Sequence, residues 1–353
     1  MKKNRALVIM LNPNGWRNPA VFGGGEIQTI NTLNRINDIA WTLILPEHLR
    51  EVLTELDNQN IECFFIKPFF KKTNVFLDII QGVIFTWITV VVGYKERDQY
   101  DLVYASTTNF SDIFPSYLLS IFLKKKLVSK YHISLYQNNL LRDIYRAYRR
   151  EKNTVFDSIV RSVLARITLF FLHRATRIFA VSRYLKQQLI QCGFPDEKIA
   201  INYNGIDFQK LESFRDADIS KEYDLCFMGR VEASKGIREF VNLVKNLKES
   251  QPNIRAVVIG DGSFLNETRK LIQSENLNEN IVVTGFLGTE RYLYLQQSRI
   301  FVSPTYANEG FGLSIIEALY FKIPVVAYTQ PVFEEIFSNY RMIQLIHQDQ
   351  ETL

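Results

Sequence analysis

The feature that most constrains the fold of this chain is a repeated alternation of short apolar segments with longer amphipathic ones. Segments typical of buried strands lie at 6–11, 41–45, 61–66, 102–105, 126–132, 178–181, 199–203, 225–228, 256–259, 281–284, 300–303 and 325–327. Stretches with helical periodicity separate them. This order is typical of βαβ units, so the sequence predicts an α/β fold with parallel sheets.

The chain length, the helix caps and a polar segment indicate how this alternating pattern is divided into domains. A chain of 353 residues is long for one ordinary domain, and its 47% hydrophobic content suffices for a buried core. Ser182 and Gly193 flank one helical stretch as an N-cap and a terminating glycine would. The polar segment 208–223 lacks periodicity and is interpreted as a linker. We therefore expect domains over 1–207 and 224–353.

Cysteine content and charge indicate the cellular compartment and the kind of partner. The three cysteines are widely spaced, which indicates no disulfide framework and favours a reducing, cytoplasmic compartment. Segment 142–177 holds nine Lys or Arg residues against three acidic ones. This basic segment predicts an anionic partner such as a membrane surface, although a solvated helix face explains it equally well. No module typical of nucleic-acid binding is present.

The segment 75–93 is almost wholly apolar and has about the length of a membrane span. Asp78 and Gln81 interrupt it, and Gly82 lowers its helix propensity. Three interpretations remain open: a buried or partly buried helix, a helix docked in a membrane interface, and a true spanning helix.

A glycine run follows the first predicted strand. Gly23, Gly24 and Gly25 precede Glu26 and a helical stretch. Glycines at a strand-to-helix turn let backbone N–H groups approach a phosphate, and the helix start adds positive potential. A tight turn that needs positive φ explains the run equally well.

Two further segments follow strands of the second half. Arg230 and Lys235 come after strand 225–228, where cations could hold a diphosphate and stabilise its leaving charge. Glu309 and Glu317 flank Gly312, near which a helix should begin. Carboxylates beside a phosphate site make sense if they accept hydrogen bonds from sugar hydroxyls. The alternative is that Glu309 only interacts favourably with the dipole of the helix and that Glu317 is an ordinary surface residue.

Taken together, these segments resemble the GT-B glycosyltransferases of family four, a large retaining group. The motifs keep that family's order along most of the chain, and the most specific is the pair Glu309 and Glu317 with Phe311 and Gly312 between them. The other matching motifs are Gly23-Gly24-Gly25-Glu26, His132, Phe179-Ala180-Val181-Ser182, Asn204-Gly205-Ile206-Asp207, Gly229-Arg230 with Lys235-Gly236, Gly260-Asp261-Gly262 and Gly285-Phe286. The resemblance implies two Rossmann-like domains that face each other across a cleft.

The resemblance also implies residue roles. Arg230 and Lys235 would bind the donor diphosphate, Glu317 the ribose, and Glu309 and His132 the transferred sugar. The remaining donor-binding positions would act through their backbone, near the nucleobase, sugar or phosphates. These are Gly23, Gly24, Gly25, Phe286, Leu287, Phe311, Gly312 and Leu313.

The implied reaction transfers a hexose from a nucleotide sugar such as a UDP- or GDP-hexose, with retained configuration. It needs neither a metal nor another cofactor, because fixed cations and a helix start stabilise the leaving group. A lipid-linked molecule or a growing glycan is the expected acceptor. A non-catalytic sugar-nucleotide-binding partner and a GT-B epimerase are the alternatives.

Two features depart from the resemblance. The last residues, 349–353, look like a helix that has just begun, so we expect the final crossing helix of the family to be missing. Asp216-Ala217-Asp218 looks like the acidic metal motif of the other glycosyltransferase fold, but it lies in the polar linker.

Overall fold

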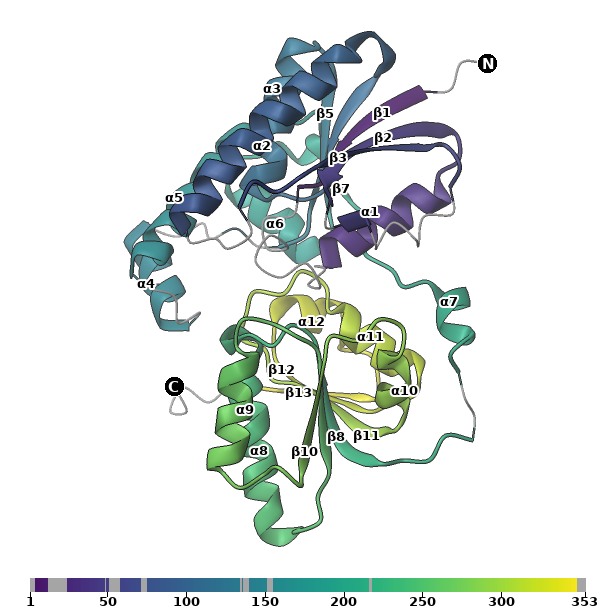
Figure 1. Cartoon of the computed structure of the whole chain (residues 1–353), viewed down its shortest axis with the longest axis vertical. Coiled ribbons are helices and arrows are strands. Elements are labelled where there is room, and N and C mark those ends of the chain that lie inside the picture. The colour runs from purple at the N-terminus through teal and green to yellow at the C-terminus, as the bar shows by residue number, and fades with distance from the viewer. Residues whose placement is uncertain are drawn as a thin grey trace. The chain divides into compact units, whose positions relative to one another are not determined.

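The computed structural model of the chain describes residues 4–11, 24–47, 49–50, 58–70, 75–133, 135, 140–150, 155–215 and 218–347 (Figure 1). Within them the chain divides into two compact units. Residues up to 148 and 155–204 make the first, whereas 149–150 and 205–347 belong to the second. Each unit is built on its own parallel sheet, which confirms the predicted α/β fold.

The described residues of the first unit form a seven-stranded parallel sheet. In spatial order its strands are β3 (Ile61–Ile66), β2 (Ile39–Pro46), β1 (Asn4–Ile9), β4 (Leu102–Ala105), β5 (Lys126–Tyr131), β6 (Arg177–Ala180) and β7 (Ile199–Ile201). The order of the strands reverses between β1 and β4. Such a switch point opens a crevice at the carboxyl ends of the two strands.

Helices cover both faces of this sheet, with α1 on one side and α2, α3 and α5 along the other (Figure 1). The helices are α1 (Gly24–Arg35), α2 (Val75–Lys95), α3 (Phe110–Phe122), α4 (Leu140–Arg150), α5 (Val155–Leu172) and α6 (Arg183–Gln191), with short 3₁₀ turns η2 (Arg97–Gln99) and η3 (Asp196–Lys198).

The alternation of side chains along β1 fills both layers of the core. Val8 packs in one cluster with Leu33 of α1. Leu7 points to the opposite face, toward α2 and α3. There, a Cβ added to Gly93 would lie 3.0 Å from Leu7 Cδ2 and 2.8 Å from Leu119 Cδ2. Gly93 therefore lets α2 approach the sheet and α3 closely.

The described residues of the second unit form a six-stranded parallel sheet. In spatial order its strands are β10 (Ile281–Gly285), β9 (Ala256–Ile259), β8 (Tyr223–Met228), β11 (Ser298–Ser303), β12 (Val325–Tyr328) and β13 (Ile343–Ile346). The order reverses between β8 and β11. The sequence expectation did not include β13, which pairs with β12 at the edge of the sheet.

Helices α8 and α9 lie on one side of this sheet, and α10 and α11 on the other (Figure 1). The helices are α7 (Phe208–Glu212), α8 (Ile237–Ser250), α9 (Leu265–Ser274), α10 (Arg291–Gln296), α11 (Leu313–Tyr320) and α12 (Pro331–Phe337), with a 3₁₀ turn η4 (Ala233–Lys235). Helix α7 lies inside the segment expected to be an irregular linker. Leu211 of α7 packs against Tyr292 of α10, so this part of the segment is anchored to the second unit.

The apolar segment 75–93 forms α2. Phe85 and Thr89 are buried on one side of the helix, whereas Trp87 and Val91 are exposed on the opposite side. In the part of the chain that the structure describes, no helix is long and apolar enough to cross a membrane.

Candidate functional site

The switch point of the second sheet brings two predicted residues together. Lys235 lies in the turn that follows β8, and Glu309 in the loop that follows β11. Because β8 and β11 are neighbours, both loops emerge at the same edge of the sheet. Lys235 Nζ donates a hydrogen bond to Glu309 Oε1 at 2.5 Å, and both side chains are about four-fifths buried.

Further hydrogen bonds fix these two loops against each other. The backbone N–H groups of Tyr306 and Ala307 both donate to the carbonyl of Ser234, at 3.1 and 3.0 Å. Thr305 Oγ1 donates to Glu309 Oε1 at 3.1 Å. The Lys235–Glu309 pair is therefore held by rigid backbone on both sides.

The pKa of Glu309 is the balance of opposing effects. Burial raises it, but the adjacent charge of Lys235 and hydrogen bonds from Lys235 and Thr305 outweigh burial. The net effect lowers the pKa, so Glu309 is a carboxylate at neutral pH. The charge of Arg230 acts in the same direction as Lys235.

Glycines allow the loops to come this close. Gly236 has a φ of 77°, and a Cβ there would lie 1.9 Å from the carbonyl oxygen of Pro304. Similarly, a Cβ on Gly260 would lie 1.9 Å from the carbonyl oxygen of Gly229. The turns after β8, β9 and β11 thus pack backbone to backbone, which only glycine permits.

Arg230 has a carboxylate partner of its own. Its Nη1 donates to Glu232 Oε1 at 2.8 Å, and both side chains are about one-third exposed. Arg230 therefore does not join the Lys235–Glu309 pair, although its charge is felt by Glu309.

Helix α11 begins beside this cluster, as the sequence predicts. Gly312 precedes it with a φ of 91°, and no side chain caps its first turn. Phe311 is buried next to it. The first N–H groups of a helix have no partner within the helix, so those near Leu313 form a potential anion site.

Glu317 lies on the second turn of α11 and has two donors. Tyr292 Oη donates to its Oε1 at 3.0 Å, and Arg291 Nη2 donates to the same oxygen at 3.2 Å. Both donors come from α10, and sequence reasoning missed them. Nothing in their spacing distinguishes them from the residues of an ordinary amphipathic helix.

Phe286 and Leu287 follow β10. Gly285, which ends this strand, accepts a hydrogen bond from the N–H of Gly260 at 3.0 Å, so the turns after β9 and β10 are adjacent. The ring of Phe286 is exposed and Leu287 is half-buried. An exposed ring at this edge offers a flat surface for stacking.

In the first unit, His132 comes directly after β5 and lies against the start of α1. A Cβ on Gly25 would lie 3.0 Å from Thr107 Cγ2 and 3.3 Å from His132 Cδ2, so Gly25 is in close contact with both side chains. Gly24 is the first residue of α1, whereas Gly23 lies outside the described residues. The structure thus brings Gly25 and His132 together.

The imidazole of His132 is neutral at neutral pH. Burial and the charge of Lys130 lower its pKa to about 3, against a smaller opposite effect of its hydrogen bond to Ser106. Nε2 lies 3.2 Å from the Ser106 carbonyl. A carbonyl only accepts, so Nε2 carries the proton and Nδ1 is an acceptor. Nδ1 is shielded from solvent and has no hydrogen-bond partner among the described residues.

Asp112 and Lys130 are two buried charged residues that sequence reasoning missed here. Asp112 accepts hydrogen bonds from Leu11 N–H, Ser106 Oγ and Thr107 Oγ1 at 2.7–2.9 Å. It thereby joins the carboxyl ends of β1 and β4, and burial raises its pKa to about 7. Burial also lowers the pKa of Lys130 to about 8.

The basic segment 142–177 is only partly described. Arg166 Nη2 pairs with the buried Asp143 at 2.6 Å, so this cation serves the packing of α5 on α4. Arg142, Arg174 and Arg177 are exposed. The metal-like motif at 216–218 lies mostly outside the described residues.

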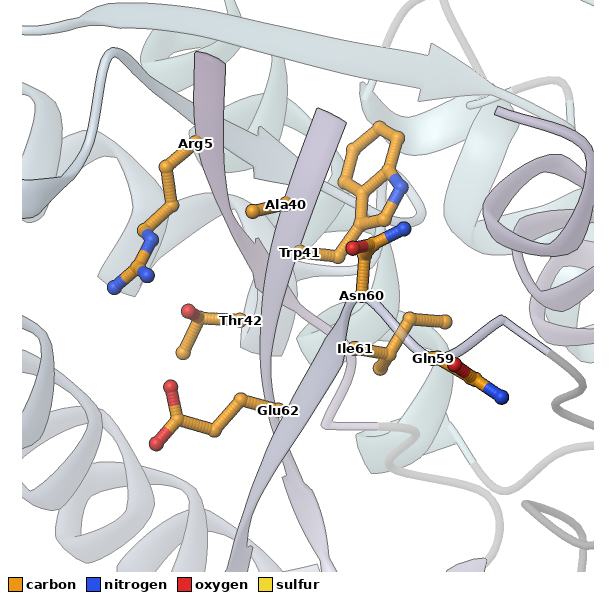
Figure 2. Close-up of a pocket in the computed structure, with 8 residues that line it drawn as sticks. All are labelled: Arg5, Ala40, Trp41, Thr42, Gln59, Asn60, Ile61 and Glu62. Carbon is orange, nitrogen blue, oxygen red and sulfur yellow. The ribbon is translucent and has the colours of Figure 1, made fainter. Parts of the chain in front are cut away.

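A hollow of about 240 Å³ lies elsewhere, at the amino-terminal half of β1, β2 and β3 (Figure 2). Its lining residues are Arg5, Ala40, Trp41, Thr42, Gln59, Asn60, Ile61 and Glu62. Figure 2 shows Arg5, Thr42 and Glu62 pointing to the same side of the strands. None of the predicted site residues lines it, and it is at the opposite edge of the sheet from His132.

Comparison with known proteins gives two family matches. Residues 48–210 match "Glycosyltransferase Family 4", and residues 209–350 match "Glycosyl transferases group 1". An uncharacterized glycosyltransferase of Methanocaldococcus jannaschii is 26% identical over 62% of this chain and 55% of its own length. An O-antigen biosynthesis glycosyltransferase of Escherichia coli is 29% identical over 41% of each chain. The match thus spans about half the length of these curated relatives.

Solved structures match almost the whole chain. The Anabaena protein HepE, solved in complex with UDP and glucose, has a TM-score of 0.69 at 18% identity, covering 97% of this chain and 85% of its own. The two parallel-sheet units and this structural neighbour show a GT-B fold. The two family matches, which together cover residues 48–350, place the chain among the group 1 glycosyltransferases.

Proposed function

We propose that this glycosyltransferase moves a hexose from a nucleotide sugar, such as a UDP- or GDP-hexose, to a hydroxyl of its acceptor. The proposed reaction retains the anomeric configuration and needs no metal ion. The observation that carries the proposal is the meeting of Lys235 and Glu309 beside the uncapped start of α11. Structural neighbours solved with UDP and UDP-glucose support a nucleoside diphosphate as the ligand.

In the proposed reaction, the diphosphate takes the place of Glu309 as the partner of Lys235. The ammonium of Lys235, the guanidinium of Arg230 and the first N–H groups of α11 then stabilise the charge that develops on the leaving diphosphate. Arg230 would exchange Glu232 for the diphosphate in the same way. Fixed cations of this kind supply what a metal ion supplies in other enzymes.

The two glutamates serve hydroxyl groups in this proposal. Once Lys235 binds phosphate, Glu309 is free to accept hydrogen bonds from the transferred sugar. Glu317 accepts from the ribose, and its hydrogen bonds from Arg291 and Tyr292 fix the carboxylate in one orientation. Arg291 and Tyr292 are positioning residues in this account.

For His132 we propose contact with the transferred sugar. The ring is neutral and partly exposed, which suits contact with a sugar and does not suit an anion. The role of an E. coli relative in O-antigen biosynthesis supports a growing glycan or a lipid-linked acceptor.

The proposal is tested with a panel of UDP- and GDP-hexoses. A bound donor raises the melting temperature, and the donor so identified is then incubated with glycan and lipid-linked acceptors without divalent metal. We expect a glycosylated product, nucleotide release that depends on the acceptor, and an anomeric linkage, read by NMR, that matches the donor. Nucleotide binding without any transfer would favour the non-catalytic partner, and an isomerised sugar the epimerase.

Lys235→Ala and Glu309→Ala should each lower turnover at least about 100-fold, the usual effect of removing one charge-stabilising group. The matched controls are Lys245→Ala and Glu275→Ala, which break an ion pair of 2.6 Å between α8 and the residue after α9. Equal losses in both pairs of variants would indicate a stability effect. Full turnover in Lys235→Ala and Glu309→Ala would overturn the site assignment.

A further inference from the structure

Helix α2 presents an apolar stripe to solvent. Its residues recur every three or four positions on the side of the helix opposite the buried Phe85 and Thr89, and they are Val83, Trp87, Val91 and Tyr94. Trp87 is 63% exposed. No charged residue occurs between Ile79 and Tyr94. An apolar stripe that faces away from its own domain is not explained by packing within that domain.

Helix α5 carries a second stripe of the same kind. Its exposed apolar residues, again at helical spacing, are Phe156, Ile159, Val163, Ile167 and Phe170. Phe170 is 68% exposed, whereas Ser158, Ser162 and Ala165 on the other side of the helix are buried.

The two stripes belong to one layer of the first unit. Helix α3 packs against both α2 and α5, and all three lie on the same side of the sheet (Figure 1). Ile121 and Phe122, at the end of α3, are also exposed. We call this surface, made by the exposed apolar residues of α2, α3 and α5, the outer helical face. Each stripe is about 15–20 Å long at 1.5 Å per residue.

One end of the outer helical face is cationic. Each of the three helices leads into a parallel strand, so their carboxyl ends lie at the same edge of the sheet. Exposed cations gather there, and they are Lys95, Lys124, Lys126 and Arg174. Acidic residues between α2 and β4 are Glu96, which accepts a hydrogen bond from Gln99, Asp98, which lies 3.9 Å from Arg97, and Asp101, which accepts from the Arg5 N–H at 2.8 Å.

We propose that the outer helical face docks on an anionic lipid surface, with the helices lying in its plane. The aliphatic and aromatic side chains would enter the interfacial layer, and the four cations would contact lipid phosphates. Charge decides between this partner and a second copy of the chain. In a dimer that packs two copies of the cationic edge close together, their like charges would repel each other. An anionic lipid surface would instead neutralise these charges. The proposal does not depend on the sugar-transfer chemistry.

The test is flotation of the full chain with phosphatidylcholine vesicles that contain or lack phosphatidylglycerol. We expect flotation only with phosphatidylglycerol, and weaker flotation at high salt. Lys124→Glu with Lys126→Glu should lower the partition coefficient at least about 30-fold, since each cation near the surface contributes about one factor of five. Trp87→Ser with Val91→Ser should lower it at least about tenfold. Tyr340→Ser, which changes an exposed aromatic residue of the second unit, is the matched control and should float normally.

Tryptophan fluorescence supplies a second readout. The chain has three tryptophans, and all fluorescence variants carry Trp16→Phe. Trp41 is buried, so Trp87 should then account for a blue shift and for protection from acrylamide when vesicles are added. Trp87→Phe should float like the unchanged chain and lose most of this signal. An unchanged Trp87 spectrum on vesicles that do carry the protein would place the contact elsewhere.

Three results would overturn the proposal. The first is equal flotation of all variants, and the second is no flotation of the unchanged chain. The third is a dimer in solution whose mass falls to that of a monomer with Trp87→Ser, because the partner would then be a second copy. Melting temperatures with UDP, measured on the same variants, separate this outcome from failure of the proposed function. Lipid binding lost with UDP binding intact concerns only the outer helical face.

Discussion

At the scale of single residues, the burial of His132 makes the stability of the fold depend on pH. Its pKa is about 3 in the folded chain and about 6.5 when unfolded. Between these values the unfolded chain binds more protons, so stability rises with pH through this window. The contribution of His132 is therefore lost as the pH falls below about 6.5.

We predict that His132→Gln flattens this dependence. Between pH 4 and 6 its free energy of unfolding should change less steeply than that of the unchanged chain, by up to about 1.4 kcal/mol per pH unit. Urea unfolding at several pH values measures the difference. Parallel curves for the two proteins would mean that His132 titrates normally in the folded chain.

The sequence indicated part of this residue-level picture. Lys235 and Glu309 could be placed together because both follow strands, and the ends of neighbouring parallel strands share an edge. Asp112 and Lys130 could not be found in this way. Their importance depends on which strands become neighbours and on burial, and neither is visible in the local pattern around them.

At the scale of elements, the turn between β8 and α8 depends on Gly236. Its φ is positive, and a Cβ at this position would lie only 1.9 Å from the Pro304 carbonyl oxygen, so no other residue fits without movement of the loop. Gly193, which ends α6, has a similar φ of 83° but nothing within 4 Å of its Cβ position. A substitution at Gly193 would introduce only backbone strain, whereas one at Gly236 would introduce both backbone strain and steric overlap.

We predict that Gly236→Ala lowers the free energy of unfolding by about 3 kcal/mol and Gly193→Ala by about 1 kcal/mol. Only Gly236→Ala should also weaken UDP binding, because it displaces the loop that carries Lys235. Urea unfolding and calorimetric titration with UDP measure both effects. Similar losses of affinity in the two variants would contradict the argument.

Most strands could be predicted, because a buried parallel strand is a continuous apolar run between turns. The caps of α6 were also correct: Ser182 Oγ accepts from Leu185 N–H at 3.1 Å, and Gly193 has the left-handed conformation. Strand β13 was missed since its residues alternate between half-buried and exposed at the edge of the sheet. Helix α7 was missed because a five-residue helix shows no periodicity.

At the scale of the whole molecule, each unit has its own hydrophobic core. The loops that carry Lys235 and Glu309 and the start of α11, which carries Glu317, lie at one edge of the sheet of the second unit, whereas α9 packs on a face of that sheet. A nucleotide that binds at this edge should therefore suppress local opening of these segments and leave the opening of distant ones unchanged.

We predict that UDP slows amide hydrogen exchange in 229–236 and 309–317 and leaves α9 unchanged. At a concentration of about 100 times its Kd, UDP should slow exchange through local opening about 100-fold. Mass spectrometry of peptic fragments measures this. Protection spread evenly over the second unit would indicate general stabilisation and not binding at this edge.

The ion pair between Lys235 and Glu309 has a consequence for selectivity. Each partner already neutralises the other, so a small anion such as phosphate or chloride that captured Lys235 would leave the buried carboxylate of Glu309 without its counter-ion. In the proposed reaction, only a ligand that carries both a negative group and hydroxyl donors compensates both partners. The built-in counter-ion would then keep the common salts of a cell from occupying the site between turnovers.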